Sequence, residues 1–81
     1  MNLKRALNKY INVSPEVLGG TPVFINTRVP IKILFDYING GESIQEFLDN
    51  YPSVNKTIPK RIVTLLSNYL IELETTNESI A

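Results

Sequence analysis

The amino-acid sequence predicts a mostly helical α+β fold, in which a small N-terminal β-hairpin precedes a bundle of three helices. Two observations carry this prediction. Two short β-prone segments flank a turn that holds a glycine pair and a proline. Beyond residue 30, apolar residues recur at helical spacing in three segments, each bounded by proline or glycine. The hairpin and the helices together are expected to form one domain over residues 11–74.

The composition limits what this domain can contain. The chain has 81 residues, enough for one domain with a small core. It has no cysteine and no histidine, which excludes disulfides and the usual zinc-binding sets, so neither a metal nor a cofactor is expected. A second subunit remains as a way to complete the core. The sequence shows no signal peptide and no apolar run of about eighteen residues, so we expect a cytoplasmic protein without a membrane partner.

Charge is unevenly distributed along the chain. The net charge is zero, which taken alone argues against a nucleic-acid ligand. Residues 72–81 hold three acids and no base, however, so the remainder of the chain has a net charge of +3. The bases form two groups: Lys4, Arg5 and Lys9 near the N-terminus, and Lys56, Lys60 and Arg61 in a segment without acids. For the N-terminal group, a solvated surface is the favoured interpretation.

The first third of the chain is expected to hold a helix and the hairpin. Apolar spacing predicts a short amphipathic helix over residues 2–9, within an N-terminal extension that spans residues 1–10. Residues 11–13 and 23–25 are predicted to be the two strands. Because two strands alone are marginally stable in water, the hairpin must pack on the helices or on a second copy of the chain.

The next two helices have clear end signals. The first is predicted over residues 31–39, between a proline and a glycine pair. The second starts at Ser43, which forms a Ser-x-x-Glu capping box with Glu46, and ends before Tyr51.

The last helix is predicted to begin at Pro59, because proline suits the first turn of a helix. Ile58 before it is biased toward an extended conformation, and residues 52–58 are interpreted as a polar connection. From residue 75 to residue 81 we expect a flexible acidic tail.

The first of these three helices is apolar on two sides. On a helical wheel, Leu34, Phe35 and Ile38 share one face, whereas Ile33 and Tyr37 lie on another. Two apolar faces need two packing partners. We therefore predict a homodimer whose interface contains Ile33 and Tyr37.

Four spaced motifs follow one another along the chain: Gly19-Gly20-Thr21-Pro22-Val23, Thr27-Arg28-Val29-Pro30, Gly41-Glu42-Ser43-Ile44-Gln45-Glu46-Phe47-Leu48 and Tyr51-Pro52. In this order, and over about residues 11–69, they resemble the signature of a small bacterial family, the domain of unknown function numbered four hundred and thirty-three. The chain departs from the pattern twice. Asn26 stands where the family has glycine, and the connection after Tyr51-Pro52 is longer.

The resemblance implies a bundle of the helix-turn-helix type and the role of an antitoxin that binds and neutralises a nuclease-like toxin. The acidic C-terminal segment is the expected toxin-binding element, because it can become ordered against a basic nuclease surface. Its predicted contact residues are Ile71, Glu72, Glu74, Glu78 and Ile80.

Six motif residues are expected to be structural: Gly19, Gly20, Pro22, Thr27, Arg28 and Pro30. The glycines permit a turn with positive φ, and the prolines restrict the chain on either side of the second strand. Arg28 is able to bind an anion. The role we favour for Arg28 is bonding to backbone carbonyls or a carboxylate, which would hold the hairpin against the helices.

An enzymatic function is not expected. No histidine or cysteine is available as a base or nucleophile near neutral pH. Glu42, Glu46 and Asp49 surround a predicted helix start, where carboxylates are favoured by the helix dipole and by solvent, so they are poor candidates for a catalytic pair.

Operator DNA is the predicted second ligand. A short capped helix followed by a longer helix with bases in its first turn has the order of a helix-turn-helix, whose second helix enters the major groove. The predicted DNA contacts are Lys60, Arg61 and Thr64 at the bases and Ser53, Asn55, Lys56 and Thr57 at the phosphates. The connection over residues 51–58 is longer than the usual turn. The alternative is a protein-interaction or adaptor module that does not touch DNA, which the zero net charge and the acidic tail favour.

Overall fold

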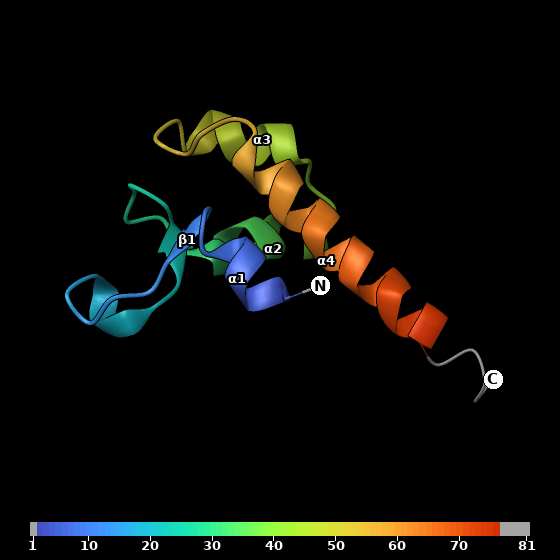
Figure 1. Cartoon of the computed structure of the whole chain (residues 1–81). Helices are drawn as coiled ribbons and strands as arrows, with labels where there is room; N and C mark the ends of the chain where they lie inside the picture. The colour runs from blue at the N-terminus through green and yellow to red at the C-terminus, as the bar shows by residue number, and fades with distance from the viewer. Residues whose placement is uncertain (1, 77–81) are drawn as a thin grey trace.

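Over residues 2–76, a first helix, a two-stranded hairpin and three further helices follow one another (Figure 1). The computed structural model describes residues 2–76. Its elements are α1 (Leu3–Leu7), β1 (Ile11–Asn12), a single 3₁₀ turn (Leu18–Gly20), β2 (Val23–Phe24), α2 (Ile31–Asn39), α3 (Ile44–Asn50) and α4 (Ile58–Thr76). The predicted class, a mostly helical α+β fold with an N-terminal hairpin, is confirmed.

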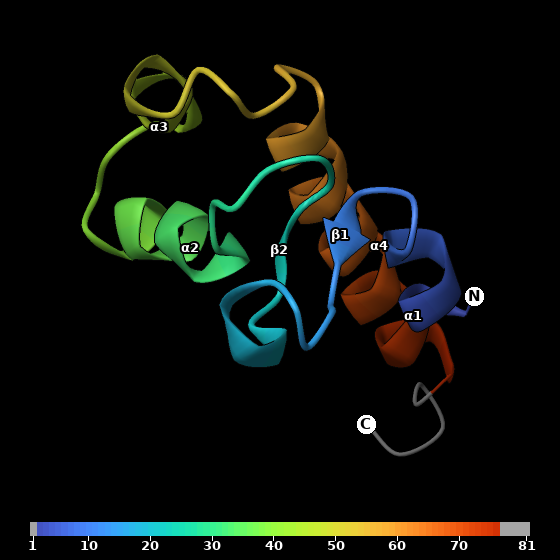
Figure 2. The ribbon, with the colours of Figure 1, turned by 90° about the vertical axis from the view of Figure 1, so that its left-hand side faces the viewer.

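The short strand β2 is held on both of its edges. On one edge it pairs antiparallel with β1, with Ile11 opposite Phe24. On the other edge the chain returns alongside it, because the Phe24 N–H donates to the Val29 carbonyl at 3.0 Å and the Ile31 N–H donates to the Pro22 carbonyl at 3.0 Å. Figure 2 shows β2 between β1 and the segment that leads into α2. This second set of hydrogen bonds stabilises a hairpin that would be marginal alone.

The return turn after β2 depends on Asn26 and Thr27. Asn26 has a φ of 61°, in the left-handed region that glycine and asparagine tolerate best. The Thr27 hydroxyl donates to the Phe24 carbonyl at 2.9 Å and accepts a hydrogen bond from the Val29 N–H at 3.0 Å. Asparagine can therefore occupy this position of the turn, where the family that the sequence resembles has glycine.

Arg28 does not hold the hairpin against the helices. Its side chain is exposed and makes no hydrogen bond or ion pair with any residue between 2 and 76. The predicted role of Arg28 is therefore wrong. Thr27 closes this turn instead, because its hydroxyl can reach two backbone groups of the same turn.

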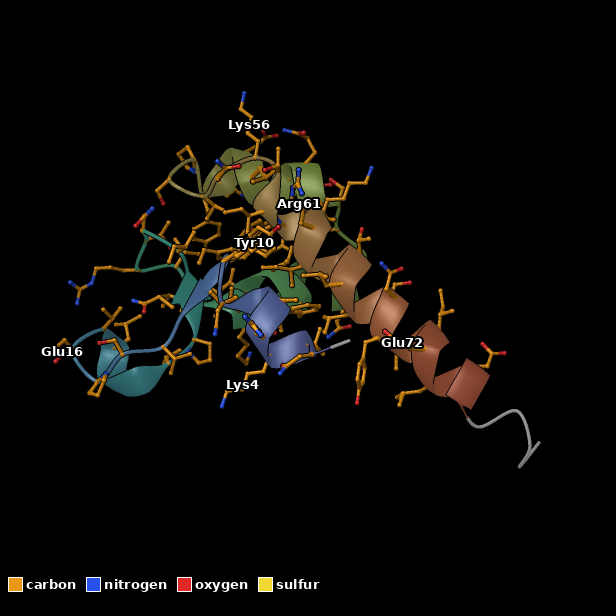
Figure 3. The ribbon with its side chains drawn as sticks, viewed as in Figure 1. Lys4, Tyr10, Glu16, Lys56, Arg61 and Glu72 are labelled. Carbon is orange, nitrogen blue, oxygen red and sulfur yellow. The ribbon has the colours of Figure 1, made fainter. Side chains whose placement is uncertain are left out.

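The longer turn between β1 and β2 requires a positive φ at several residues, which explains its glycine pair. Leu18, Gly19 and Gly20 all have positive φ, at 48°, 63° and 92°. Residues without a Cβ adopt this conformation at little cost, as predicted for the two glycines. The same loop carries Glu16 (Figure 3), whose pKa lies below its usual value because the Ser14 hydroxyl donates to its carboxylate.

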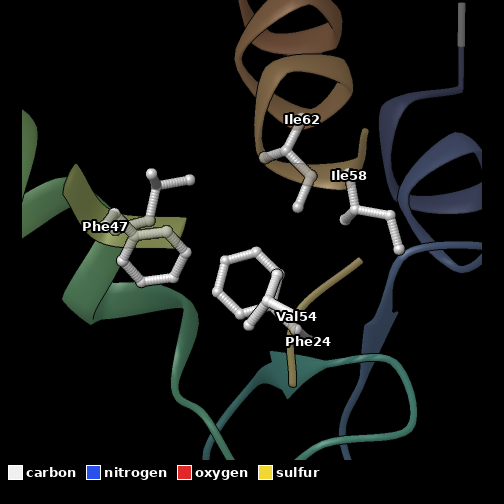
Figure 4. Packing of buried hydrophobic residues seen from close by; sticks show 6 residues of the cluster. Phe24, Phe47, Val54, Ile58 and Ile62 are labelled. Carbon is white, nitrogen blue, oxygen red and sulfur yellow. The ribbon is translucent and has the colours of Figure 1, made fainter. Parts of the chain in front are cut away.

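Every segment from β2 to α4 contributes to one apolar core (Figure 4). The rings of Phe24, from β2, and Phe47, from α3, lie with their centroids 5.4 Å apart. The buried members of this core are Phe24, Leu34, Phe47, Val54, Ile58 and Ile62.

The connection between α3 and α4 is part of this core, so its interpretation as a polar segment is wrong. Val54 in the connection is only 3% exposed. Ile58 is also buried and is the first residue of α4, not an extended residue before the helix. Pro59 follows at the second helical position, where the missing N–H costs nothing because first-turn N–H groups have no partner within the helix. Burial of Ile58 outweighs its bias toward an extended conformation.

The two faces predicted for α2 are not separate. The Tyr37 ring lies against Phe47 and Tyr51, at centroid distances of 5.6 and 6.2 Å, and its hydroxyl accepts a hydrogen bond from the Asn50 side chain at 2.8 Å. Ile33 is half-buried against the same core. Ile38 is 37% exposed, although it shares a face of the helical wheel with the buried Leu34. The prediction that Ile33 and Tyr37 face away from the core is wrong, because α3 packs on that side of α2.

The predicted ends of α2 and α3 agree with the structure. Gly41, with a φ of 82°, turns the chain so that the Glu42 N–H donates to the Tyr37 carbonyl at 2.9 Å. The Ser43 hydroxyl then accepts a hydrogen bond from the Glu46 N–H at 3.0 Å and caps α3.

The two ends of the described chain meet, because α1 packs against α4. The N-terminal extension is thus an integral helix, capped by the Asn2 side chain, which accepts a hydrogen bond from the Arg5 N–H at 3.0 Å. At the other end, α4 continues to Thr76, two residues beyond the predicted limit of the domain. The remainder of the predicted tail, residues 77–81, lies outside the described residues.

The left-handed turn at Asn26 makes a prediction about stability. Replacing Asn26 with alanine should lower the free energy of unfolding by about 1 kcal/mol, because alanine adopts this conformation only with strain. Asn26→Gly should leave it within about 0.5 kcal/mol of the wild type. Urea denaturation of the three proteins measures the difference, and equal stability of the alanine and glycine variants would contradict it.

Candidate nucleic-acid interface

A groove of about 520 Å³ lies beside the start of α4. We call it the basic groove, and its lining residues are Tyr10, Lys56, Thr57, Lys60, Arg61, Thr64 and Leu65. Five of the seven predicted DNA contacts are therefore brought together in one place. The other two, Ser53 and Asn55, do not line it.

Helical spacing explains why most of these residues meet. Residues three and four apart lie on the same side of a helix, so Lys60 and Thr64 face the groove together, with Arg61 beside them. Tyr10 reaches the groove because α1 packs against α4. Figure 3 shows Tyr10 beside the first half of α4, with Arg61 in front of that helix and Lys56 beyond its start. Tyr10 and Leu65 were not among the predicted contacts. Nothing local in the sequence shows that α1 packs against α4, which is what brings Tyr10 to the groove.

The bases of the groove are not neutralised within the chain. Lys56, Lys60 and Arg61 are exposed, and none of them forms an ion pair in the part of the chain that the structure describes. Lys32 on α2 contrasts with them, because its amino group lies 2.8 Å from the Asp36 carboxylate. The lining contains no acid. The dipole of α4 adds partial positive charge at this end, so the groove is suited to a phosphate or another anion.

Asn55 holds the chain locally at the start of α4. Its side-chain oxygen accepts a hydrogen bond from the Thr57 N–H at 3.0 Å and another from the Thr57 hydroxyl at 2.8 Å. Its backbone carbonyl accepts a hydrogen bond from the Ile58 N–H at 3.1 Å. Asn55 thereby sets the first turn of α4 and orients the backbone on which Lys56 lies.

Acidic residues near Lys56 make the α3 side of the groove unfavourable for a nucleic acid, so the side of Tyr10 is the better approach. On the other side of Lys56, a second groove of about 410 Å³ includes Asp49 of α3. Glu46 and Asp49 are exposed on α3, and these carboxylates would repel a nucleic-acid backbone that crossed this helix. In a helix-turn-helix the first helix lies across the backbone, so α3 is poorly suited to that role.

None of the three N-terminal bases, Lys4, Arg5 and Lys9, lines the basic groove. Lys4 lines a separate groove with Leu7, Val13 and Ile25, and Figure 3 shows Lys4 at the opposite end of the molecule from Lys56. Residues 2–76 contain no group of three or more carboxylates that could hold a metal ion. None of the helices described is long and apolar enough to cross a membrane.

Comparison with known proteins identifies the family. Residues 11–58 match the family model "Protein of unknown function (DUF433)". The chain belongs to the DUF433 family. The matched segment covers the hairpin, α2, α3 and the connection, and it ends at the first residue of α4, earlier than the motif resemblance had indicated. Lys60, Arg61 and Thr64 therefore lie beyond the segment that defines this DUF433 protein.

A relative in Sinorhizobium fredii carries a similar segment. It is the uncharacterized protein y4eO, which is 36% identical over 50 residues. The similar region covers 62% of this DUF433 chain but only 23% of y4eO, so the chain matches less than a quarter of that protein. No solved structure matches the chain.

Because the basic residues of the groove are exposed, we expect their replacement to leave the stability of the fold almost unchanged. Lys60→Ala and Arg61→Ala should change the free energy of unfolding by no more than about 0.5 kcal/mol, because neither side chain is buried or paired within the described chain. Ile62→Ala, one position further, should cost about 2–5 kcal/mol, because Ile62 is 1% exposed. Thermal denaturation of the three variants tests this. A large loss in Lys60→Ala would show that this lysine supports the fold.

Proposed function

We propose that this DUF433 protein is a non-catalytic antitoxin of a cytoplasmic toxin–antitoxin pair, and that it binds its operator DNA through the basic groove. The observation that carries the proposal is the gathering of Lys56, Lys60 and Arg61 around one groove without an acid in its lining. Bases in such a place are expected to bind phosphate with an affinity that falls steeply with salt.

The chemistry of the groove supports distinct roles for its residues. Lys60 is a flexible point charge, suited to a phosphate of any sequence. Arg61 carries a planar guanidinium that can donate two hydrogen bonds to guanine, so it is the better candidate for reading a base. The hydroxyl of Thr64 lies one turn further along α4 and can add a neutral hydrogen bond.

Two features support toxin binding: the family motifs, and the exposed residues near the C-terminal end of α4. Leu70 and Ile71 are 63% and 57% exposed, and the exposed acids Glu72 and Glu74 lie next to them. An apolar patch with acids around it fits a basic, nuclease-like partner surface. Two further predicted toxin contacts, Glu78 and Ile80, lie outside the described residues.

The second candidate is a protein-interaction module without DNA binding. The same exposed apolar residues on α4 favour it, as do the zero net charge and the acids on α3. DNA binding therefore has to be measured directly.

A salt titration of DNA binding tests the basic groove. Lys60→Ala should weaken binding to the DNA upstream of the gene and to unrelated sequences by a similar factor. It should also reduce the slope of log affinity against log salt concentration by about one. Arg61→Ala should cost about 1–3 kcal/mol and relax the preference at one base pair. Lys32→Ala is the matched control, because Lys32 is exposed and basic but lies on α2 and pairs with Asp36. Fluorescence anisotropy with labelled duplexes gives these affinities.

Two results would argue against DNA binding at this groove. An equal loss in Lys32→Ala and Lys60→Ala would mean that only overall charge matters. Absence of binding at low salt would leave the interaction module as the function.

Neutralisation of a nuclease-like toxin encoded beside the gene tests the antitoxin role. Ile71→Asp should weaken neutralisation by roughly tenfold or more, because it places a charge in the apolar contact. Val13→Asp makes the same change at an exposed residue near the hairpin and should have no effect. Unimpaired neutralisation by Ile71→Asp would move the toxin site away from α4. A chain ending at Thr75 that neutralises as well as the full chain would exclude Glu78 and Ile80.

A further inference from the structure

One face of α4 stays exposed over most of its length. Lys60, Thr64, Ser67, Ile71 and Glu74 are spaced alternately by four and three residues, so they form one line along the helix. All five are exposed, and we call this line the α4 face. Figure 1 shows that the C-terminal half of α4 extends past α2 and α3.

The charges on the α4 face are ordered from base to acid. Lys60, with Arg61 beside it, stands in the first turn, and Glu74, with Glu72 near it, stands close to the end. Residues 62–71 between them carry no charge. At 1.5 Å per residue, the two charged ends are about 21 Å apart.

This order is the reverse of the one that stabilises a helix by itself. Acids are favourable at the N-terminus of a helix and bases at the C-terminus, because they oppose the helix dipole. The first turn of α4 contains no acid and its last turn contains no base. The helix dipole therefore gives no reason for Lys60 and Glu74 at these positions, whereas an antiparallel neighbour would bring each of them beside its opposite.

We propose that two copies of the chain associate through their α4 faces, packed antiparallel around Ser67. Ser67 lies midway between Lys60 and Glu74, so a two-fold axis there places Lys60 next to the partner's Glu74 and, at the same time, Glu74 next to the partner's Lys60. A symmetric dimer needs a self-complementary surface of this kind. The small side chain of Ser67 at the crossing point permits the close approach of two helices.

Ile71 supplies the apolar part of the contact. It is 57% exposed on an otherwise polar face. In the antiparallel arrangement it lies near the methyl group of the partner's Thr64, which removes apolar surface of both residues from water. This interface takes the place of the one predicted at Ile33 and Tyr37, which pack within the chain.

The interface has a consequence for the proposed function, although it does not depend on it. Lys60 belongs both to the α4 face and to the basic groove. Ile71 and Glu74 belong both to the α4 face and to the proposed toxin contact. A second copy therefore competes with DNA for Lys60 and with the toxin for Ile71 and Glu74, so self-association opposes both interactions.

Charge reversal tests the pairing. Lys60→Glu and Glu74→Lys should each raise the dissociation constant of the dimer by roughly tenfold at low salt, because both symmetric contacts become repulsive. The double variant Lys60→Glu/Glu74→Lys should restore the wild-type constant, since each contact is re-formed with its charges exchanged. Sedimentation equilibrium of the full chain over a range of concentrations measures the constants, and circular dichroism confirms that each variant is folded.

Neighbouring apolar residues provide the matched control. Ile71→Gln should weaken the dimer, whereas Leu70→Gln should not, because Leu70 is equally accessible but about 100° away around the helix. The proposal is overturned by a wild type that stays monomeric at all concentrations, by a double variant that does not recover, or by equal effects at Leu70 and Ile71.

DNA binding of the double variant separates the two proposals. If both hold, the double variant dimerises like the wild type but binds DNA weakly, because Lys60 is gone. Recovery of the dimer without any effect on DNA binding would remove Lys60 from the DNA interface and leave the dimer standing. A double variant that does not dimerise but binds DNA weakly, as expected from the loss of Lys60, would overturn the dimer and leave the DNA interface standing.

Discussion

The contact between the rings of Phe24 and Phe47 is the interaction on which the rest of the structure depends. Phe24 comes from a strand of two residues and Phe47 from a helix of two turns, and neither element is long enough to be stable alone. Their burial against one another and against Ile62 joins the hairpin to the helices. The hydrogen bonds around β2 then fix the direction in which the chain leaves toward α2.

Features that depend on neighbours in sequence could be predicted, and features that depend on distant segments could not. The glycine pair after α2 and the Ser43 cap of α3 act within one turn, so the ends of these helices followed from the residues themselves. Tyr37 was misplaced because a helical wheel shows which residues share a face but not which face α3 will cover. Val54 was misread for the same reason, since one apolar residue among polar ones has no periodicity.

The candidate site divides along the same line. Four residues of the basic groove are close together in the sequence: Lys56, Lys60, Arg61 and Thr64. Helical spacing brings them together once the position of α4 is known. Tyr10 joins them only through the packing of α1 on α4, which no local pattern indicates. Arg28 shows the converse error, because a charged residue inside a family motif suggested a contact with the helices that it does not make, whereas its neighbour Thr27 closes the turn.

The family match ends at Ile58, which is also the residue where α4 enters the core. Beyond that point one side of the helix packs against α1 and the core, and another side, which includes Lys60, Thr64 and Ser67, is exposed. The exposed side chains of α4 carry little of the stability of the fold, because they lie outside its core. Substitutions on this exposed side can therefore change the surface that the chain presents while its fold stays the same.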